Sequence, residues 1–418
     1  MSTVISKDKY YSILFAICIA VTYLNNFELT ISVWSLTLFL TITKKYSLTI
    51  LKLTVCFLAI FSIAFLVMLF KDYKIYNIIR DITYLIKPII GLLLGYQLCK
   101  KNFQKVFQTI VYTGVFIAIF HMILIFYAII FHNAITVNDI RMYGGYFSDF
   151  EIYALIILVF HKNFELGFSK KQLLKYSIII AISSFMYLAR TNFIQFVILF
   201  VAMKGLLKIN KTSIAVLSSL LLIILIGYSA ILYVNPKRNG PGIEALLYKI
   251  KIAPTEPFKT KVDFEDWKDF NDNYRSYENI QTVKQITYDG INTIIFGKGI
   301  GSQIDLKKKI SLGDTELRFI SILHNGYMTV LLKAGLIGVF IYLYSIFLFF
   351  KLTKTNKPIV SNINLLLIGT GVFLIFSSWV FMGVYNLIDN KSILIGILIC
   401  YKEMAQKTPI ISDNKKND

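Results

Sequence analysis

Apolar stretches long enough to cross a lipid bilayer recur along most of this chain, and they limit its possible folds more than any other feature. An α-helix rises 1.5 Å per residue, so about 20 apolar residues cross the ~30 Å hydrocarbon core of a membrane. Only 16% of the 418 residues are charged and 56% are hydrophobic, a composition that would leave a soluble domain poorly solvated. The sequence therefore predicts an all-α polytopic membrane protein.

We expect about 12 transmembrane helices, with one large external helical loop between the last three and the others. The loop covers residues 235–321, after about nine helices in residues 1–234 and before about three in residues 322–402. A tail of residues 403–418 follows. The predicted segments are residues 10–25, 28–43, 48–70, 80–99, 105–131, 149–161, 173–189, 191–207, 213–234, 322–350, 362–385 and 389–402.

Lysine clusters set the expected orientation of these helices. Lys44 and Lys45, Lys100 and Lys101, and the Lys-rich tail fall in alternating loops, and basic loops face the cytoplasm. Both termini are therefore expected in the cytoplasm and the large loop outside. The same rule accounts for most of the net charge of +20, and no nucleic-acid partner is expected.

Within the large loop, residues 274–288 have the pattern of an amphipathic helix. Tyr277, Ile280, Val283 and Ile286 follow one another at helical spacing, and Asp289-Gly290 closes the segment. We expect this helix to pack over the membrane domain.

A histidine and an asparagine, His324 and Asn325, stand where the loop re-enters an apolar run. Polar and ionisable groups at that depth are costly and indicate function. Imidazole has an ordinary pKa near 6.5, which suits a general base at neutral pH.

Two arginines are candidates for binding an anion. Arg190 stands between two apolar runs, and Arg275 lies in the first turn of the predicted loop helix. A guanidinium binds phosphate through two parallel hydrogen bonds. The alternatives are interfacial snorkelling of Arg190 and a surface ion pair between Arg275 and Glu278.

Several of these features occur together in a known family. The peptide FGKGIG, the later HNGY with Gly335 and Gly338 one turn apart, and RMYGGYFSDF resemble the O-antigen ligase and polymerase family over residues 135–350. These are polytopic bacterial glycosyltransferases that use polyprenyl-diphosphate-linked sugars. Ala189 replaces a serine of the family pattern, and Lys333 stands where relatives often have an acidic residue.

The resemblance implies roles for individual residues. His324 would be catalytic, and Arg190 and Arg275 would bind the diphosphate. Arg141, Asn325, Tyr327 and Gly299 are supporting candidates. No metal site and no cofactor are expected, since the sequence has no HExxH motif and no DxD on the external side.

The implied activity is that of a surface polysaccharide polymerase, which transfers a glycan from undecaprenyl diphosphate to a sugar hydroxyl of another lipid-linked repeat unit. The alternatives are an O-antigen ligase that uses lipid A core as acceptor and, from a different class, a polysaccharide flippase or sugar transporter. A transporter would show matching broken helices in two halves, and the sequence shows none. The implied partners are the lipid-linked oligosaccharide, membrane lipid and a chain-length regulator protein. The implied location is the bacterial inner membrane, with the active site facing the exterior.

Overall fold

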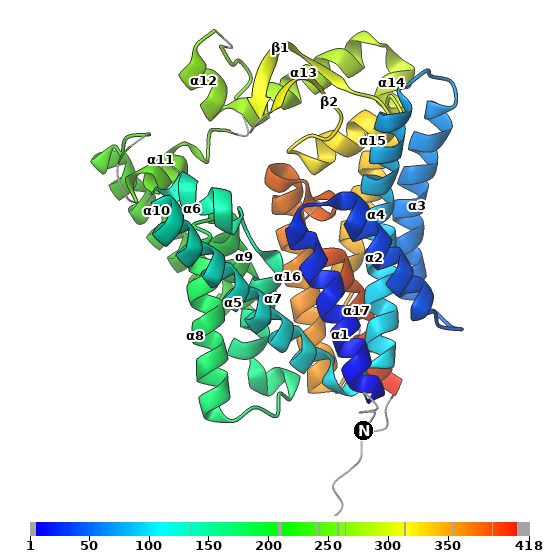
Figure 1. Ribbon diagram of the computed structural model, residues 1–418, viewed down its shortest axis with the longest axis vertical. Coiled ribbons are helices and arrows are strands. Elements are labelled where there is room, and N and C mark those ends of the chain that lie inside the picture. Colours follow the sequence, from blue (N-terminus) through cyan, green and yellow to red (C-terminus); the bar gives the residue numbers. More distant parts are fainter. Residues whose placement is uncertain are drawn as a thin grey trace, which may run out of the picture.

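The structure is a computed structural model that describes residues 6–134, 136–207, 211–238, 240, 243–256, 259–263, 265–312, 315–352, 355–386 and 388–407. Most of these residues are helical, and the described part contains one two-stranded sheet. Figure 1 shows the long helices packed side by side, with the elements of the large loop gathered at one end.

The helices before the large loop are α1 Lys7–Ala20, α2 Phe27–Leu40, α3 Leu48–Met68, α4 Ile75–Lys101, α5 Val106–His132, α6 Val137–Gly144, α7 Asp149–Val159, α8 Lys170–Met186, α9 Arg190–Met203 and α10 Lys211–Val234. The loop contains α11 Glu244–Ile252, α12 Trp267–Asp272, α13 Tyr274–Tyr288, α14 Ile291–Phe296, β1 Ile304–Leu312 and β2 Thr315–Ile320. The chain continues with α15 Gly326–Phe347, α16 Pro358–Phe381 and α17 Lys391–Lys407. Each predicted transmembrane segment overlaps one of these helices.

Length and composition divide these helices into two groups. Among the described residues, 6 helices are long and apolar enough to cross a membrane, and they are α3, α4, α5, α10, α15 and α16. The other predicted segments form shorter helices, from 11 residues in α7 to 17 in α8 and α17. The structure therefore supports a polytopic helical protein, whereas the number of about 12 spans stays a prediction.

Both described chain ends lie at the end of the bundle opposite the loop elements (Figure 1). Near the end of α17, the ring of Tyr401 stacks on Phe103 with centroids 4.4 Å apart. Lys105, two residues after Phe103, pairs with Asp8 of α1 at 3.5 Å. This arrangement agrees with the predicted register, which puts both termini on one side.

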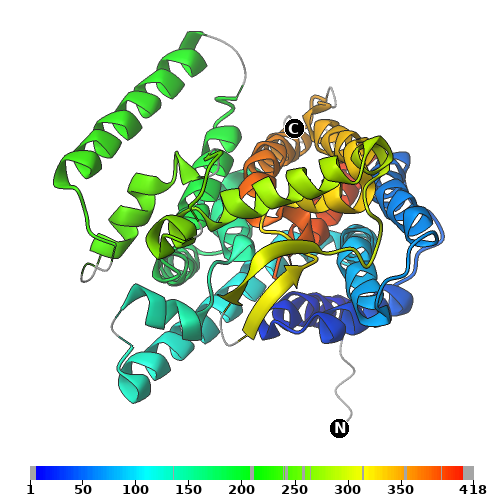
Figure 2. The same cartoon turned by 90° about the horizontal axis from the view of Figure 1, so that it is seen from above.

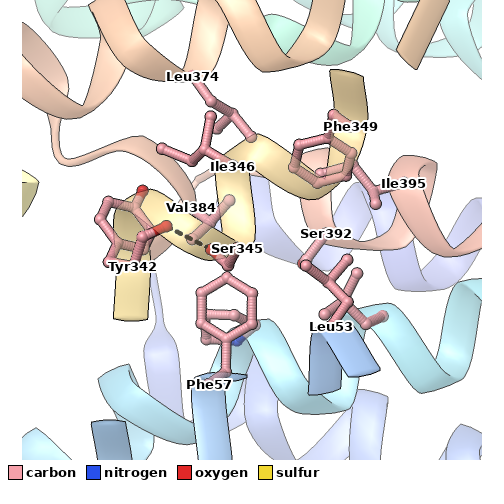
Figure 3. Close-up of a pocket in the computed structure, with 12 residues that line it drawn as sticks. Leu53, Phe57, Tyr342, Ser345, Ile346, Phe349, Leu374, Val384, Ser392 and Ile395 are labelled. Atoms are coloured by element: carbon pink, nitrogen blue, oxygen red, sulfur yellow. Dashed lines mark hydrogen bonds between the residues drawn. The ribbon is translucent and has the colours of Figure 1, made fainter. Parts of the chain in front are cut away.

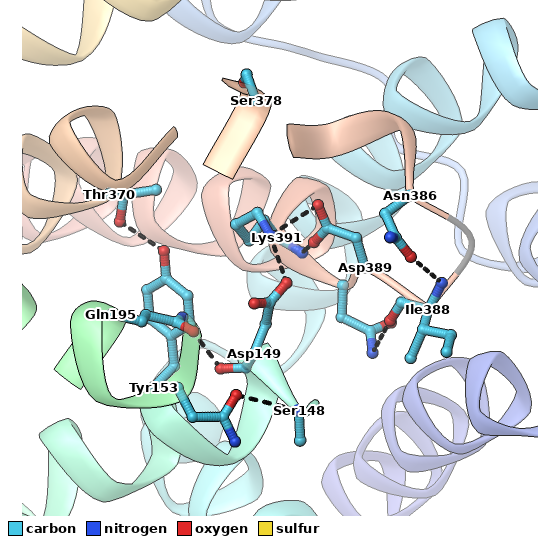
Figure 4. Close-up of polar contacts among 12 residues, drawn as sticks. Ser148, Asp149, Tyr153, Gln195, Thr370, Ser378, Asn386, Ile388, Asp389 and Lys391 are labelled. Atoms are coloured by element: carbon cyan, nitrogen blue, oxygen red, sulfur yellow. Dashed lines mark hydrogen bonds and ion pairs between the residues drawn. The ribbon is translucent and has the colours of Figure 1, made fainter. Parts of the chain in front are cut away.

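The interior of the bundle contains paired charges beside the start of α7 (Figure 4). Lys391 of α17 pairs with Asp149 of α7, and with Asp389 at 2.9 Å. Lys87 of α4 is 2% exposed and donates to the carbonyl oxygen of Asp389 at 2.9 Å. Because buried charges are tolerated only when paired, this network fixes the short α7 against α4 and α17.

A small cavity lies inside the bundle, between α3, α4, α15 and α17 (Figure 3). Phe57, Tyr342 and Ile346 are among its lining residues. Its volume of about 10 Å³ has room for at most one water molecule. This cavity is therefore too small for a substrate.

A glycine-rich turn, residues 297–301, attaches the loop to the bundle. The N–H of Gly299 donates to the carbonyl oxygen of Lys333 at 3.1 Å. Gly299 has a φ of 85°, and a Cβ there would lie 2.7 Å from the backbone nitrogen of Met68. Only glycine fits such a position. Gly299, predicted as a supporting site residue, thus packs this turn against α3 and α15.

A buried ion pair holds the same junction. Lys333 Nζ of α15 lies 2.6 Å from Asp81 Oδ2 of α4, and both side chains are fully buried. Asp81 Oδ2 also accepts the N–H of Gly301 at 2.7 Å, and Lys333 donates to the carbonyl oxygen of Ser302 at 2.5 Å. Lys333, which departs from the family pattern, is therefore matched by Asp81 in this chain.

We expect Lys333→Met to destabilise the folded protein by about 3–5 kcal/mol, because it removes the buried cation of Asp81 and leaves only Arg80, at 3.9 Å, beside the buried carboxylate. Thermal unfolding in detergent measures the change. Arg318→Gln is the control, since it breaks an exposed ion pair with Asp305, and it should barely change the melting temperature. Equal melting temperatures for Lys333→Met and wild type would contradict this role.

The large loop is not purely helical, which corrects the prediction for residues 304–312 and 315–320. β1 and β2 form an antiparallel hairpin in which Ile304 lies opposite Ile320, with an irregularity between Asp305 and Ile310. The hairpin packs on α13, where Tyr277 Oη donates to the carbonyl oxygen of Leu306 at 2.6 Å. A two-stranded hairpin is marginal on its own, so this tertiary contact supports it.

Candidate functional site

The structure brings together the three arginines that the sequence singled out. They come from α6 (Arg141), from the start of α9 (Arg190) and from the start of α13 (Arg275). Arg190 Nη2 lies 3.6 Å from Glu256 Oε2, and Arg275 Nη1 lies 3.2 Å from Glu256 Oε1. One carboxylate thus holds two guanidinium groups that are 85 positions apart in the chain.

Arg141 completes this group from the short loop after α5. Its Nη2 donates to the carbonyl oxygen of Tyr146 at 3.4 Å, and its guanidinium lies 5.2 Å from the centre of that ring. Arg141 Nε is buried with no hydrogen-bond partner among the described residues. Burial, together with the positive charges of Arg190 and Arg275, lowers the pKa of Arg141. Repulsion of this kind shows that the three cations are close to one another.

Two further cations belong to the same group, and the sequence analysis missed both. Lys249 lies on α11, and its carbonyl oxygen accepts a hydrogen bond from Arg190. Arg238 Nε lies 3.2 Å from Asp272 Oδ1, and its guanidinium covers the ring of Trp267 at 4.5 Å. Neither residue belongs to a motif, so only the tertiary structure identifies them.

We call Arg141, Arg190, Arg238, Lys249 and Arg275 the basic cluster. Glu256 and Asp272 are the acidic side chains that pair with its members in the described part of the chain. The ion pairs of Arg190, Arg238 and Arg275 with these two carboxylates put more positive than negative charge into this part of the described structure. Burial, followed by the charges of the four arginines, lowers the pKa of Lys249 to about 8. A bound anion would relieve this repulsion, so the electrostatics of the basic cluster favour anion binding.

Anion binding should weaken as the pH rises through the pKa of Lys249. Below about 8 its ammonium carries a positive charge, and above that pH the charge is lost. With sulfate, which keeps its charge across this range, we expect affinity to fall severalfold between pH 7 and pH 9 in calorimetric titrations. Lys249→Arg should remove the pH dependence because arginine stays protonated. Equal sulfate affinities at the two pH values in the wild type would exclude Lys249 from the site.

A histidine–carboxylate pair lies next to the basic cluster. His324 Nδ1 lies 3.0 Å and 3.1 Å from the two carboxylate oxygens of Glu278, and the His324 backbone N–H donates to Glu278 Oε2 at 3.1 Å. Glu278 is 1% exposed, whereas the His324 side chain is 42% exposed. The Tyr274 ring packs edge-on against the imidazole at 5.6 Å.

This geometry assigns the two imidazole nitrogens. An ionised carboxylate only accepts hydrogen bonds, so Nδ1 carries the proton that faces Glu278. In the neutral ring, Nε2 then carries the lone pair. The surface ion pair between Arg275 and Glu278, an alternative from the sequence, is not formed, because Arg275 pairs with Glu256 and Glu278 is buried against His324. The sequence analysis considered Glu278 only as a partner of Arg275, and the structure makes it the partner of His324.

Helix α13 connects the histidine pair to the basic cluster. The predicted helix over residues 274–288 is confirmed, and Figure 2 shows α13 crossing over the end of the bundle. Its buried face differs in part from the predicted one, because Glu278 and Thr282 are buried whereas Val283 is 46% exposed. Arg275 and Glu278 are three residues apart and therefore lie on the same side of the helix.

The remaining supporting candidates have structural contacts of their own. Asn325 is the N-cap of α15, and its side-chain oxygen accepts the N–H groups of Tyr327 at 2.9 Å and Met328 at 3.2 Å. Capping satisfies backbone donors at the start of a helix. Tyr327 Oη donates to the carbonyl oxygen of Ile375 on α16 at 3.1 Å. These contacts position the segment that carries His324.

An open pocket of about 500 Å³ lies beside the basic cluster, between the end of α11 and the junction of α12 and α13. It is lined by Ile252, Pro254, Thr255, Lys259, Asp272 and Asn273. Two of these lining residues, Thr255 and Asn273, directly precede Glu256 and Tyr274 in the chain. The pocket, the basic cluster and the histidine pair thus meet at the start of α13.

Comparisons of the chain with protein-family models, with curated proteins and with solved structures found no match.

Proposed function

We propose that this protein is a polytopic membrane glycosyltransferase that polymerises a surface polysaccharide from undecaprenyl-diphosphate-linked repeat units. The observation that carries the proposal is the Glu278–His324 pair, placed three residues along α13 from Arg275 of the basic cluster. A general base and an anion site side by side are what glycan transfer from a diphosphate requires. The resemblance of FGKGIG and HNGY to the O-antigen ligase and polymerase family supports the same activity.

In the proposed reaction, the acceptor hydroxyl oxygen attacks the anomeric carbon of the donor sugar. The carbon–oxygen bond to the diphosphate breaks, and its electron pair leaves with undecaprenyl diphosphate. His324 Nε2 accepts the hydroxyl proton and later releases it to water. Glu278 stabilises the resulting imidazolium and keeps Nδ1 protonated, as the orienting carboxylate does in other histidine sites.

The basic cluster would stabilise the leaving group. Negative charge develops on the diphosphate as the bond breaks, and fixed cations aimed at it lower the barrier. Arg190 and Arg275 would bind the phosphates through their planar guanidinium groups. Since Glu256 now contacts both, the diphosphate would compete with this carboxylate for them.

The proposal includes a location. We place the protein in the bacterial inner membrane, with about 12 spans, both termini in the cytoplasm and the large loop outside. The donor is already activated by its diphosphate, so the reaction needs no nucleotide on the external side. The lipid-linked oligosaccharide would reach the site from the membrane.

Replacing Glu278 with glutamine tests the pairing directly. Glutamine has the same shape but no negative charge, so we expect kcat to fall about 10–100-fold, a typical effect of losing a partner that orients histidine. KM for the lipid-linked donor should stay near the wild-type value, and an unchanged melting temperature would show that the lower kcat does not come from unfolding. Glu316→Gln, the same change at an exposed position of β2, is the control. A rise in KM at constant kcat would instead make Glu278 a binding residue.

A further inference from the structure

We propose that the pocket between the end of α11 and the α12–α13 junction binds the glycan of the donor, the sugars attached directly to the diphosphate. This inference rests on the proposed function and adds a second binding site to it. The pocket has a volume of about 500 Å³, within the ~300–1,000 Å³ range of small-molecule sites in proteins.

The position of the pocket is the first argument. Thr255 lines it, and the next residue, Glu256, contacts Arg190 and Arg275 of the basic cluster. Asn273 also lines the pocket, and the next residue, Tyr274, packs its ring on His324. A sugar linked to a phosphate at the basic cluster would therefore have both the pocket and the imidazole near it. The reacting anomeric carbon must lie between those two groups.

The chemistry of the lining is the second argument. A sugar presents hydroxyl groups at its edge and C–H groups on its faces, and the pocket has partners for both. Thr255, Lys259, Asp272 and Asn273 supply polar groups, whereas Ile252 and Pro254 supply apolar surface. Polar groups held beside apolar surface can bind the hydroxyl groups and the C–H faces of a sugar together.

Two of the polar side chains of the pocket are held in place by other residues. Asp272 Oδ2 accepts a hydrogen bond from Tyr248 Oη at 2.5 Å, while Asp272 Oδ1 pairs with Arg238. Asn273 Nδ2 donates to the carbonyl oxygen of Asp269 at 3.0 Å, which leaves the amide oxygen of Asn273 to accept from a ligand. Side chains fixed in this way need little further ordering when a ligand binds.

The pocket can be tested by filling it. Thr255→Trp places a large ring in the cavity, and Thr287→Trp makes the same change on the exposed side of α13. The donor is the lipid-linked oligosaccharide extracted from cells that lack this protein and accumulate its substrate. We expect Thr255→Trp to raise KM about tenfold or more. Thr287→Trp should leave KM near the wild-type value. Thr255→Val, which removes only the hydroxyl, should raise KM by a smaller factor.

Binding of inorganic pyrophosphate separates the possible failures. If Thr255→Trp binds pyrophosphate as wild type does, the protein is folded and the basic cluster is intact. An unchanged KM in that variant would then overturn the glycan pocket and leave the proposed function standing. If wild-type protein binds no pyrophosphate, the basic cluster is not a diphosphate site, and the proposed function fails first. Loss of pyrophosphate binding in both Thr255 variants would also overturn the pocket, because Thr255 would then support the basic cluster.

Discussion

His324→Asn should reduce polymer synthesis about 10²–10⁴-fold, the usual contribution of a positioned general base. Asparagine can still donate a hydrogen bond to Glu278, but it cannot accept a proton at neutral pH. It is a cleaner variant than alanine, because His324→Ala leaves the buried Glu278 without its side-chain partner, at a cost of about 1–3 kcal/mol. Both variants should still insert into the membrane and bind the lipid-linked donor.

The measurement is the rate of chain growth from purified donor, followed by polymer length. His132→Asn provides a matched control, since His132 is exposed at the end of α5 and stacks on Tyr143 at 4.7 Å, away from α13. That variant should retain wild-type activity. Near-normal growth with His324→Asn would rule out the base assignment and leave His324 as a hydrogen-bonding residue that anchors α13.

Arg190→Lys and Arg275→Lys should each reduce turnover about 10²–10³-fold, the range found when one fixed donor to a developing negative charge is removed. A lysine keeps the positive charge, but its ammonium cannot form two parallel hydrogen bonds to a phosphate. The structure adds a reason for a large effect, because both guanidinium groups are positioned by the two oxygens of Glu256.

Arg318→Lys is the control for these variants. Arg318 also makes a two-point contact, with Asp305 at 2.8 Å and 2.9 Å, but it lies on the exposed hairpin. The Arg318→Lys variant should leave both turnover and pyrophosphate binding unchanged. Arg190→Lys and Arg275→Lys should lower turnover and also bind pyrophosphate more weakly. Normal polymer assembly by both Arg190→Lys and Arg275→Lys would reduce these arginines to structural or interfacial roles.

The sequence alone predicted the helices well, for a physical reason. Apolar runs must satisfy their backbone hydrogen bonds within the lipid, and only helices do so segment by segment. Helix α13 was also predicted at its observed bounds, from the spacing of its apolar residues. The hairpin at residues 304–320 was not predicted, because its stability comes from contacts with α13. Asp305, for example, exchanges hydrogen bonds of 2.7 Å and 3.0 Å with the side chain of Gln285.

The candidate site was predicted only in part. His324, Arg190 and Arg275 could be identified because their side-chain chemistry and the family resemblance mark them individually. Lys249, Arg238 and the two carboxylates that hold the site together, Glu256 and Glu278, have no local signature. Their importance depends on which residues they contact, and those residues can be far away in the chain. The two arginines that contact Glu256, for example, are 19 and 66 positions from it.

The central claim is that this protein forms a glycosidic bond at the expense of a sugar–diphosphate bond. The most direct measurement incubates purified protein with the single-repeat lipid-linked oligosaccharide, in detergent and with EDTA present. We expect oligosaccharides of two and more repeats, with one undecaprenyl diphosphate released for each bond formed. His324→Asn should form both products at least about 10²-fold more slowly. Attachment to added lipid A core without chain growth would identify a ligase. Movement of the lipid-linked oligosaccharide across proteoliposomes, with no new glycosidic bond and no diphosphate released, would contradict the proposal and identify a transporter.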